Sequence, residues 1–497
     1  MSKYHIITFG CQMNKSDSER IKSVFEHLKY SLVDEMEQAD FVVINACSVR
    51  QTAMDRALGL LKELEKKPQI KRILTGCVLP EDKEKYKKRF DLIFNIKDLS
   101  ELEKFLHDES EYVNEDYFDV LPSYSNSYQA FVPIMTGCNN YCSYCAVPYV
   151  RGRETSRTVK DVLAEIKALA KKGYKEIQLL GQNVNSYDPV DVENFAKDNP
   201  YDHNFAKLLW EVNRINDISR IHFTSSHPKD MSDEVLHALG LSKLLNYLHL
   251  PLQSGDDDIL KAMNRNYTAR DYFRIVKKLR KFNPNIAIGT DIMLGFPGET
   301  REMFENTLKF YKKVKFDISF NATYSPRGGT ASANLEDDVS QDEKRRRWHE
   351  LHAVMMKIAL EKSKKFIGKT VSVLIDKKTS EFCEGNSREM KRVRVYDCDC
   401  NEGDLIDVDE HSPFAAVLAF QRGFDGAAND GLGASAMRDQ IGNASIRRLA
   451  LKTNIQDLVR LARADPLGRT NPDALAGKFP AGDWLLAKAE ALAVRRE

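Results

Sequence analysis

The sequence has almost no net charge and no long apolar run. Its 497 residues include 74 Lys and Arg against 73 Asp and Glu, a formal net charge of +1. A balance this even excludes binding of a polyanion by bulk charge, so nucleic acid could be bound only by local patches. No run reaches the roughly 18 apolar residues of a transmembrane helix. The start also lacks the pattern of a secretory signal, and we expect a cytoplasmic protein with no membrane partner.

Cysteine is scarce, odd in number and grouped. Nine cysteines occur in a long chain that is rich in Lys and Glu. An odd count in such a chain argues against a secreted disulfide scaffold. In a reducing compartment, grouped cysteines more often bind metal or take part in chemistry.

The first 120 residues predict an α/β domain, because short β-branched runs alternate with amphipathic stretches. The expected parallel strands are Tyr4–Gly10, Phe41–Ala46 and Arg72–Gly76. Each run ends at a cysteine: Cys11, Cys47 or Cys77. Ligands of an open parallel sheet gather at the carboxyl ends of its strands, so we expect these three thiols to converge. Three inert buried cysteines are the less favoured alternative.

After an acidic linker at Asp108–Ser127, residues 128–365 repeat the alternation. An amphipathic helix is expected at Thr158–Lys172. Six β/α repeats predict a partial (β/α)6 barrel with its active site at the strand carboxyl ends. The expected strands are Phe131–Thr136, Ile177–Leu180, Ile221–Thr224, Tyr247–Leu250, Ala287–Leu294 and Ile318–Tyr324.

Residues 366–411 predict a small β domain, with strands at Lys369–Ile375, Arg392–Tyr396 and Leu405–Val408. Its cysteines, Cys383, Cys398 and Cys400, are interpreted as ordinary thiols, with metal binding as the alternative. Residues 412–497 are rich in Ala and Arg and contain no cysteine. We expect an α-helical tail there, either an appended helical domain or a sequence of different origin, and assign it no chemistry.

The strongest chemical motif is Cys138-x-x-x-Cys142-x-x-Cys145, in a loop after the first strand of the second alternation. Three thiolates from one loop can hold a [4Fe–4S] cluster and leave one iron open for another ligand. A closed zinc site would need a fourth ligand. We favour the cluster, because the loop opens a β/α series rather than a compact zinc ribbon.

This motif, with Tyr144 before its last cysteine, resembles the signature of radical S-adenosylmethionine (SAM) enzymes. Further segments extend the resemblance to the methylthiotransferase family over residues 3 to about 409, nearest to the branch that acts on isopentenylated adenosine in tRNA. Among these segments are Gly10-Cys11-Gln12-Met13-Asn14, Ser225-Ser226-His227-Pro228, Leu250-Pro251-Leu252-Gln253-Ser254-Gly255 and Gly295-Phe296-Pro297-Gly298-Glu299.

The resemblance implies a reaction in which the C2–H of N6-isopentenyladenosine, beside the tRNA anticodon, is replaced by a methylthio group. It implies SAM and two [4Fe–4S] clusters as cofactors, the second an auxiliary cluster on Cys11, Cys47 and Cys77. A radical cofactor suits this reaction, because acid–base chemistry cannot activate a strong apolar C–H bond. The resemblance also implies the tRNA anticodon stem-loop and an electron donor such as flavodoxin or ferredoxin as partners. We expect a monomer.

Candidate contacts follow from the same segments. The SAM-binding candidates are Tyr144, Gly181, Gln182, Asn183, Gln253, Gly295, Gly298 and Glu299. The small β domain resembles the RNA-binding TRAM module, and the RNA-binding candidates are Arg151, Arg153, Arg388, Lys391, Arg392 and Arg394. Three histidines at strand ends are interpreted as packing or hydrogen-bonded residues rather than ligands: His222, His227 and His249.

Two alternatives stay open. The substrate could be threonylcarbamoyladenosine or a ribosomal-protein aspartate instead of isopentenyladenosine. The chain could also be a non-catalytic iron–sulfur protein that binds RNA or carries electrons. A ferredoxin-like carrier needs four cysteines per cluster, so two sets of three argue against it.

Overall fold

The computed structural model describes residues 2–49, 51–107, 117–396, 398–408 and 416–418. The chain divides into two compact units, residues 1–418 and 419–497. Every element described below belongs to the first unit, and the predicted helical tail lies almost wholly outside the described residues. Among the described helices, none combines the length and the apolar character needed to cross a membrane.

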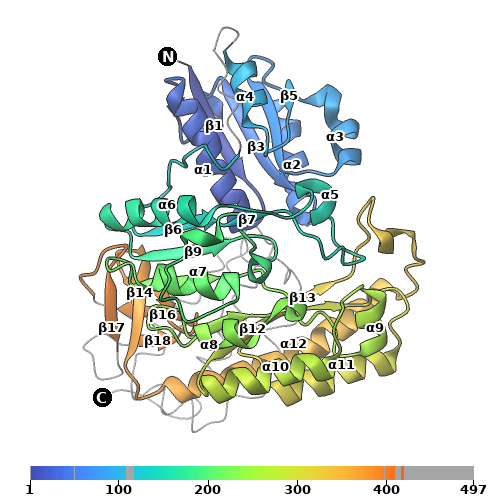
Figure 1. Ribbon diagram of the computed structural model, residues 1–497. Helices are drawn as coiled ribbons and strands as arrows, with labels where there is room; N and C mark the ends of the chain where they lie inside the picture. Colours follow the sequence, from blue (N-terminus) through green and yellow to red (C-terminus); the bar gives the residue numbers. More distant parts are fainter. Residues whose placement is uncertain (1, 50, 108–116, 397, 409–415, 419–497) are drawn as a thin grey trace, which may run out of the picture. The chain divides into compact units, whose positions relative to one another are not determined.

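The N-terminal domain is a parallel sheet with the strand order β2-β1-β3-β4-β5 (Figure 1). The strands are β1 (Lys3–Thr8), β2 (Ser31–Leu32), β3 (Phe41–Cys47), β4 (Lys71–Cys77) and β5 (Leu92–Ile93). The helices are α1 (Gln12–His27), α2 (Gln51–Leu64), α3 (Pro80–Tyr86) and α4 (Leu99–Leu106). Strands β3 and β4 are buried almost throughout, as expected for apolar runs covered on both faces. The predicted parallel α/β domain is confirmed.

The second alternation forms two parallel three-stranded sheets, β10-β9-β6 and β11-β12-β13. A parallel bridge between Ile221 and Leu244 joins them into one six-strand series. The strands are β6 (Gln129–Pro133), β9 (Glu176–Leu180), β10 (Arg220–Phe223), β11 (Tyr247–His249), β12 (Ala287–Leu294) and β13 (Ile318–Thr323). A short antiparallel pair, β7 (Met135–Thr136) and β8 (Thr155–Ser156), brackets the cysteine loop. The predicted partial barrel is confirmed.

Helices connect and cover these strands, and N-cap side chains stabilise the starts of several of them. Thr158 caps α6, and Thr268 and Asp271 form a reciprocal capping box at α10. The helices are α5 (Val147–Arg151), α6 (Val159–Lys171), α7 (Asn204–Asn213), α8 (Asp233–Ala238), α9 (Asp257–Ala262), α10 (Ala269–Phe282), α11 (Arg301–Val314) and α12 (Gln341–Ser363).

The small domain is an antiparallel sheet with the order β17-β14-β15-β16-β18. Its strands are β14 (Val371–Lys378), β15 (Phe382–Ser387), β16 (Arg392–Tyr396), β17 (Leu405–Val408) and β18 (Ala416–Leu418). Strand β15 was not expected from the sequence. Strand β18 pairs with β16, so the sheet includes residues beyond 411, where the sequence analysis ended this domain.

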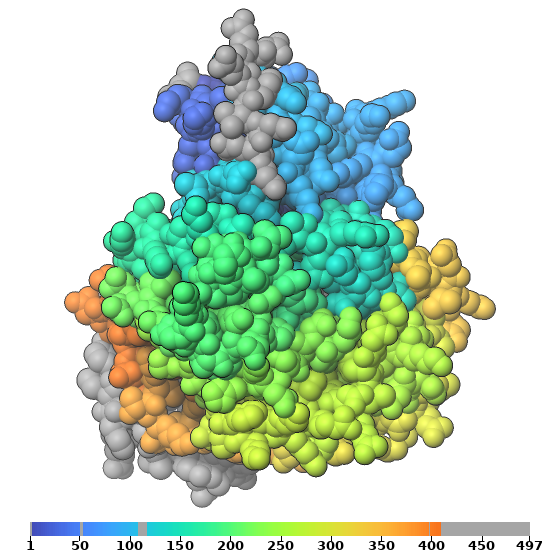
Figure 2. Space-filling model, in the orientation of Figure 1, coloured from blue at the N-terminus to red at the C-terminus, as the bar shows by residue number. Residues whose placement is uncertain are grey.

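The N-terminal domain and the barrel share one hydrophobic core. Phe25 and Phe94 of the first domain pack in the same cluster as Phe131 and Leu180 of the barrel strands. The space-filling view shows the N-terminal domain (blue) lying directly against the first barrel segments (teal) (Figure 2). The carboxyl ends of β3 and β4 are therefore held at a fixed place beside the barrel.

The small domain is fastened to the barrel by two arginines that cross in opposite directions. Arg220 of β10 donates to the carbonyls of Asn386 and Ser387 at 2.9 and 3.2 Å. Arg388 returns, donating to the carbonyls of Ser242 and Leu244 at 2.6 Å each. We call this reciprocal pair the arginine clasp.

Candidate functional site

Cys11, Cys47 and Cys77, here called the N-terminal triad, meet at the carboxyl edge of the first sheet. Cys47 and Cys77 are register partners on β3 and β4. The side-chain oxygen of Asn14 lies 3.5 Å from the Cys11 Sγ and 3.9 Å from the Cys77 Sγ. The three thiols at the strand ends therefore lie in one place, as predicted.

A glycine makes this convergence possible. Gly76 has a φ of +101°, and a Cβ there would lie 2.3 Å from the carbonyl oxygen of Ala46. Only a residue without a side chain lets β3 and β4 approach so closely just before their cysteines.

The N-terminal triad lies against one buried cation. The Nε of Arg151 lies 3.1 Å from the Cys77 Sγ, and its guanidinium forms a buried ion pair with Asp17. A hydrogen bond with Cys47 and burial raise the pKa of the Cys77 thiol, whereas the charge of Arg151 lowers it. Arg151 is only 2% exposed, so the RNA contact predicted for it does not fit this position.

Cys138, Cys142 and Cys145, the loop triad, lie in a loop that is anchored on several sides. Gly137 donates its N–H to the Gln182 side chain, and Cys138 donates to the carbonyl of Gly152 at 3.2 Å. Ser143 donates to the carbonyl of Met263 at 3.0 Å. The loop is therefore held in place by the ends of β9 and α9.

The loop triad also faces a buried cation, which the sequence analysis missed. The Nη1 of Arg265 lies 3.3 Å from the Cys142 Sγ. Burial and the neighbouring thiols raise the pKa of Cys145 to about 12, and Arg265 lowers it. Each triad thus has one guanidinium within hydrogen-bonding distance of one thiol.

The short helix α5 begins two residues after Cys145 and lies beside the N-terminal domain in Figure 1. Ala146 directly follows Cys145, and Ala146 and Val150 pack in one cluster with Cys47 and Cys77. Arg151, at the end of the same helix, reaches the N-terminal triad. One turn of helix therefore runs from the loop triad to the N-terminal triad.

The donor chemistry of both triads fits an iron–sulfur cluster. Buried thiols that raise one another's pKa ionise together only where positive charge is supplied. One guanidinium per triad compensates part of three thiolate charges, and bound iron would compensate the rest. Three soft thiolates also leave one iron of a four-iron cluster without a protein ligand. That these six cysteines are ligands stays a prediction.

The SAM-binding candidates fall around the loop triad. Tyr144 packs in one cluster with Phe296, which links the cysteine loop to the Gly295–Glu299 segment. Gln182 accepts from Gly137, and the Asn183 amide donates to Asp230 at 2.8 Å. The Oδ1 of Asn183 is buried and has no hydrogen-bond partner within the described part of the chain.

Glu299 has a positioning role of its own. It is 2% exposed, pairs with Arg347 at 2.7 Å and accepts from the N–H of Gly295 at 2.7 Å. These contacts hold the turn, in which Gly295 and Gly298 have φ values of +67° and +82°. Gly181 is also crowded, since a Cβ there would lie 2.5 Å from Met135, and Gln253 has a φ of +71°.

The basic candidates of the small domain are engaged inside the protein. Arg392 pairs with Asp376 and Glu384. Arg394 pairs with Glu384 and Lys391 with Asp317, while Arg388 belongs to the arginine clasp. Arg153, beside the cysteine loop, is exposed. Of the six RNA-binding candidates, Arg153 is the one whose position best suits a phosphate contact.

The three strand-end histidines agree with their interpretation as packing residues. Burial lowers the pKa of His227 to about 2 and that of His222 to about 3, so both stay neutral. His249 hydrogen-bonds to Tyr247 and Asp291.

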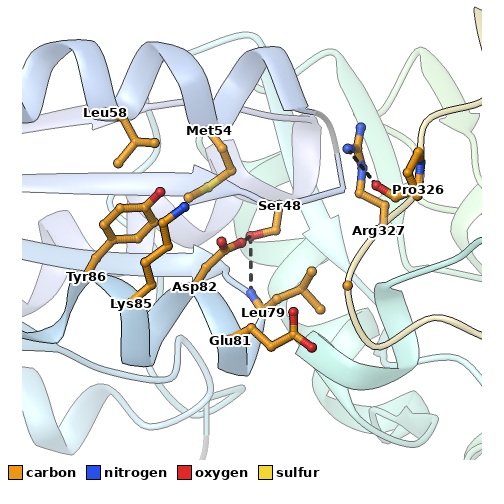
Figure 3. A pocket seen from close by; sticks show the side chains of 11 residues that line it. Ser48, Met54, Leu58, Leu79, Glu81, Asp82, Lys85, Tyr86, Pro326 and Arg327 are labelled. Carbon is orange, nitrogen blue, oxygen red and sulfur yellow. Dashed lines mark hydrogen bonds between the residues drawn. The ribbon is translucent and has the colours of Figure 1, made fainter. Parts of the chain in front are cut away.

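A pocket of about 180 Å³ is lined by Ser48 and Leu79, which follow Cys47 and Cys77 in the sequence (Figure 3). Ser48, which follows Cys47, donates to Asp82 at 2.8 Å and accepts from the N–H of Leu79 at 3.2 Å. Arg327, from a barrel segment, closes the opposite side and donates to the carbonyl of Val49. The carboxyl edge of the first sheet therefore faces a barrel segment across a polar pocket.

Comparison with known proteins agrees with this organisation. A model described as Radical SAM superfamily matches residues 132–311, and one described as Uncharacterized protein family UPF0004 matches residues 3–95. The tRNA-2-methylthio-N(6)-dimethylallyladenosine synthase of Clostridium novyi (strain NT) is 42% identical over 429 residues, 82% of this chain and 93% of that protein. The chain belongs to this synthase family.

The synthases of two other bacteria give the same result. That of Thermoanaerobacter sp. (strain X514) is 41% identical over 430 residues, 82% of this chain and 89% of the relative. That of Caldicellulosiruptor saccharolyticus is 42% identical over 415 residues, 79% and 86% of the two chains. In this member of the synthase family, the residues matched by the UPF0004 model include the N-terminal triad. Those matched by the Radical SAM model include the loop triad.

Proposed function

We propose that this protein converts N6-dimethylallyladenosine in tRNA, at the position beside the anticodon, to its 2-methylthio derivative. The observation that carries the proposal is the pair of three-cysteine sets joined by α5, in a chain 42% identical to a tRNA-2-methylthio-N(6)-dimethylallyladenosine synthase. A non-catalytic electron carrier would need neither two open three-cysteine sets nor their placement on both sides of one short helix.

The residues divide between two sites. Cys138, Cys142 and Cys145 would hold the cluster that binds SAM, and Cys11, Cys47 and Cys77 would hold the auxiliary cluster. When bound, the clusters and SAM would supply the radical, the sulfur and the methyl group. Arg265 and Arg151 place a fixed positive charge against each set and so favour its anionic form.

The protein's other contribution is orientation. Gln182 and Gly137 fix the start of the cysteine loop, and Tyr144 packs the loop against Phe296. Arg347 and Glu299 hold the glycine turn beside it. These contacts preorganise the walls of the proposed SAM site, whose candidate contacts are Tyr144, Gly181, Gln182, Asn183, Gln253, Gly295 and Gly298.

The proposed partners follow from the chemistry. The target base in an anticodon loop is unpaired and can be splayed out, as sequence-specific RNA recognition usually requires. The exposed Arg153 is the proposed phosphate contact near the cysteine loop. A one-electron donor such as flavodoxin or ferredoxin would reduce the protein, and we propose that it acts as a cytoplasmic monomer.

The test is methylthiolation by the purified protein, reconstituted anaerobically with iron and sulfide and supplied with SAM and a reductant. Nucleoside mass spectrometry should find the methylthio product on isopentenylated tRNA and none on tRNA lacking the isopentenyl group. Product on threonylcarbamoyladenosine tRNA or on a ribosomal protein instead would move the enzyme to another branch. Absence of SAM cleavage from a fully loaded protein would overturn the enzymatic proposal.

A further inference from the structure

A third group of cysteines lies in the small β domain, far from the two triads in sequence. The Sγ atoms of Cys383, Cys398 and Cys400 all lie within 4.8 Å of one another. The sequence favoured ordinary thiols here, with metal binding as the alternative, and the convergence supports that alternative. We propose that these three cysteines bind one Zn²⁺ ion, a site independent of the methylthiolation chemistry.

The three thiols come from two segments that the fold brings together. Cys383 lies on β15, opposite Val395 of β16. Cys398 and Cys400 follow β16, and the carbonyl of Cys400 lies 3.5 Å from the Cys383 Sγ. An ion held by all three would tie the middle of the sheet to the segment that leaves its neighbouring strand.

The cysteine-bearing segment is anchored on its far side as well. After Cys400, Asn401 donates its N–H to the Asp404 carboxylate at 2.7 Å. Two backbone hydrogen bonds join this turn to β14: the Gly403 N–H donates to the Ile375 carbonyl at 2.8 Å, and the Ile375 N–H donates to the Asp404 carbonyl at 2.9 Å. The thiols are thus placed by the sheet itself, which is the preorganisation that a metal site needs.

The burial and the sulfur donors of this group favour a bound soft metal ion over three thiols without a metal. Cys383 and Cys400 are 1% and 8% exposed and pack among Val373, Val393 and Val395. Cys398 is partly exposed, which provides an entry path. Three polarisable sulfur donors within contact distance of one another, two of them buried, have the arrangement of thiolate metal sites.

The spacing favours a single ion. Tetrahedral zinc with Zn–S bonds of about 2.3 Å sets its sulfur ligands about 3.8 Å apart. Thiols within 4.8 Å of one another need only small side-chain rotations to reach that distance. A four-iron cluster binds each thiolate through a different iron atom and so needs its cysteines farther apart. Water would occupy the fourth zinc position.

The experiment uses the full-length chain with the six cysteines of the other two triads replaced by Ala, so that no cluster cysteine can bind zinc. After loading with Zn²⁺ and desalting, elemental analysis should find about one zinc per chain. Adding Cys398→Ser should reduce this at least about tenfold. Asp399→Asn is the matched control, since Asp399 is fully exposed between the two ligands, and it should keep its zinc.

Alkylation followed by mass spectrometry provides a second measurement that does not depend on the variants. In zinc-loaded protein the three cysteines should resist alkylation and become reactive after a chelator is added. Free alkylation with no bound zinc would overturn the proposal. So would protection removed by a reductant but not by a chelator, which would indicate a disulfide, or recovery of copper in place of zinc.

Discussion

The Nε of Arg151 lies 3.1 Å from the Sγ of Cys77, although the two residues belong to different domains and are 74 positions apart. The same guanidinium is bound to Asp17, whose carboxylate also accepts from the Tyr117 hydroxyl at 2.6 Å. A cation from the barrel thus completes the surroundings of the N-terminal triad, and Arg265 does the same for Cys142.

Replacing Arg151 by Met should destabilise the protein by about 3–5 kcal/mol, because it leaves the buried Asp17 carboxylate without its ion pair. Adding Asp17→Asn should recover part of that loss. Urea unfolding followed by circular dichroism measures both changes. Arg153→Met, two residues away and exposed, is the control and should stay within about 0.5 kcal/mol of the parent. An Arg151 variant as stable as this control would contradict the prediction.

Replacing one cysteine in each triad should distinguish the roles of the two triads. Cys138→Ala should abolish reductive SAM cleavage, whereas Cys47→Ala should keep SAM cleavage and lose methylthiolation. Each variant should keep about half of the iron, because the other three-cysteine set is intact. Anaerobic iron counting and chromatography of the SAM products make the comparison. Loss of all iron from either variant would show that the sites are not independent.

Two glycines with the same φ of +82° should respond differently to Ala. At Gly298 a Cβ meets nothing within 4 Å, so Gly298→Ala should cost only the left-handed backbone, about 1–2 kcal/mol. At Gly137 a Cβ would lie 2.0 Å from the carbonyl oxygen of Arg153, which adds about 1–3 kcal/mol of overpacking. Thermal unfolding should rank Gly137→Ala clearly below Gly298→Ala, and equal losses would refute the steric argument.

His222 should make the fold sensitive to acid. Burial, then the charge of Arg220, lowers its pKa to about 3. Below the unfolded pKa of about 6.5 the unfolded chain binds a proton that the folded chain does not. Stability is therefore lost as pH falls below about 6.5, by at most about 1.4 kcal/mol per pH unit. His222→Gln lacks this acid-dependent loss of stability. Between pH 6 and pH 4 its free energy of unfolding should therefore fall less than that of the parent protein. If the free energies of unfolding of variant and parent changed equally with pH, the lowered pKa of His222 would be contradicted.

Salt dependence should distinguish the RNA-binding candidates. Arg153→Gln should weaken tRNA binding and reduce the slope of log affinity against log salt by about 0.7–0.9, the value for one phosphate contact. Arg392→Gln should leave the slope unchanged, because Arg392 is occupied by Asp376 and Glu384. A change for Arg392 and none for Arg153 would move the RNA contact to the small domain.

The parallel elements were predictable because each strand is a compact apolar run. The predicted Ala287–Leu294 coincides with β12, and Phe41–Ala46 falls one residue short of β3. Strand β15 was missed because its sequence, Phe-Cys-Glu-Gly-Asn-Ser, has the composition of a turn. Gly385 is required there by packing, since a Cβ would lie 2.0 Å from the Leu374 carbonyl oxygen of the neighbouring strand. That contact exists only in the folded sheet.

The cysteines of the site could be predicted, whereas their charged neighbours could not. The loop triad is recognisable from its local spacing, and the N-terminal triad from the position of its cysteines at the ends of predicted strands. Arg151 and Arg265 meet Asp17 and Cys142 across 134 and 123 residues. A basic residue beside a loop is usually solvated, and nothing in the local sequence of Arg151 indicates that it is buried.

The arginine clasp bears on how a large substrate would dock. Arg220 and Arg388 each donate to main-chain carbonyls across the boundary between barrel and small domain. Main-chain carbonyls in folded segments cannot change rotamer as side-chain acceptors can. If tRNA engages both domains, their mutual orientation is already set in the free protein. The entropic penalty of orienting one domain on the other then falls on folding rather than on association. Encounter with tRNA should accordingly be a single-phase, diffusion-controlled event without a slower closing phase.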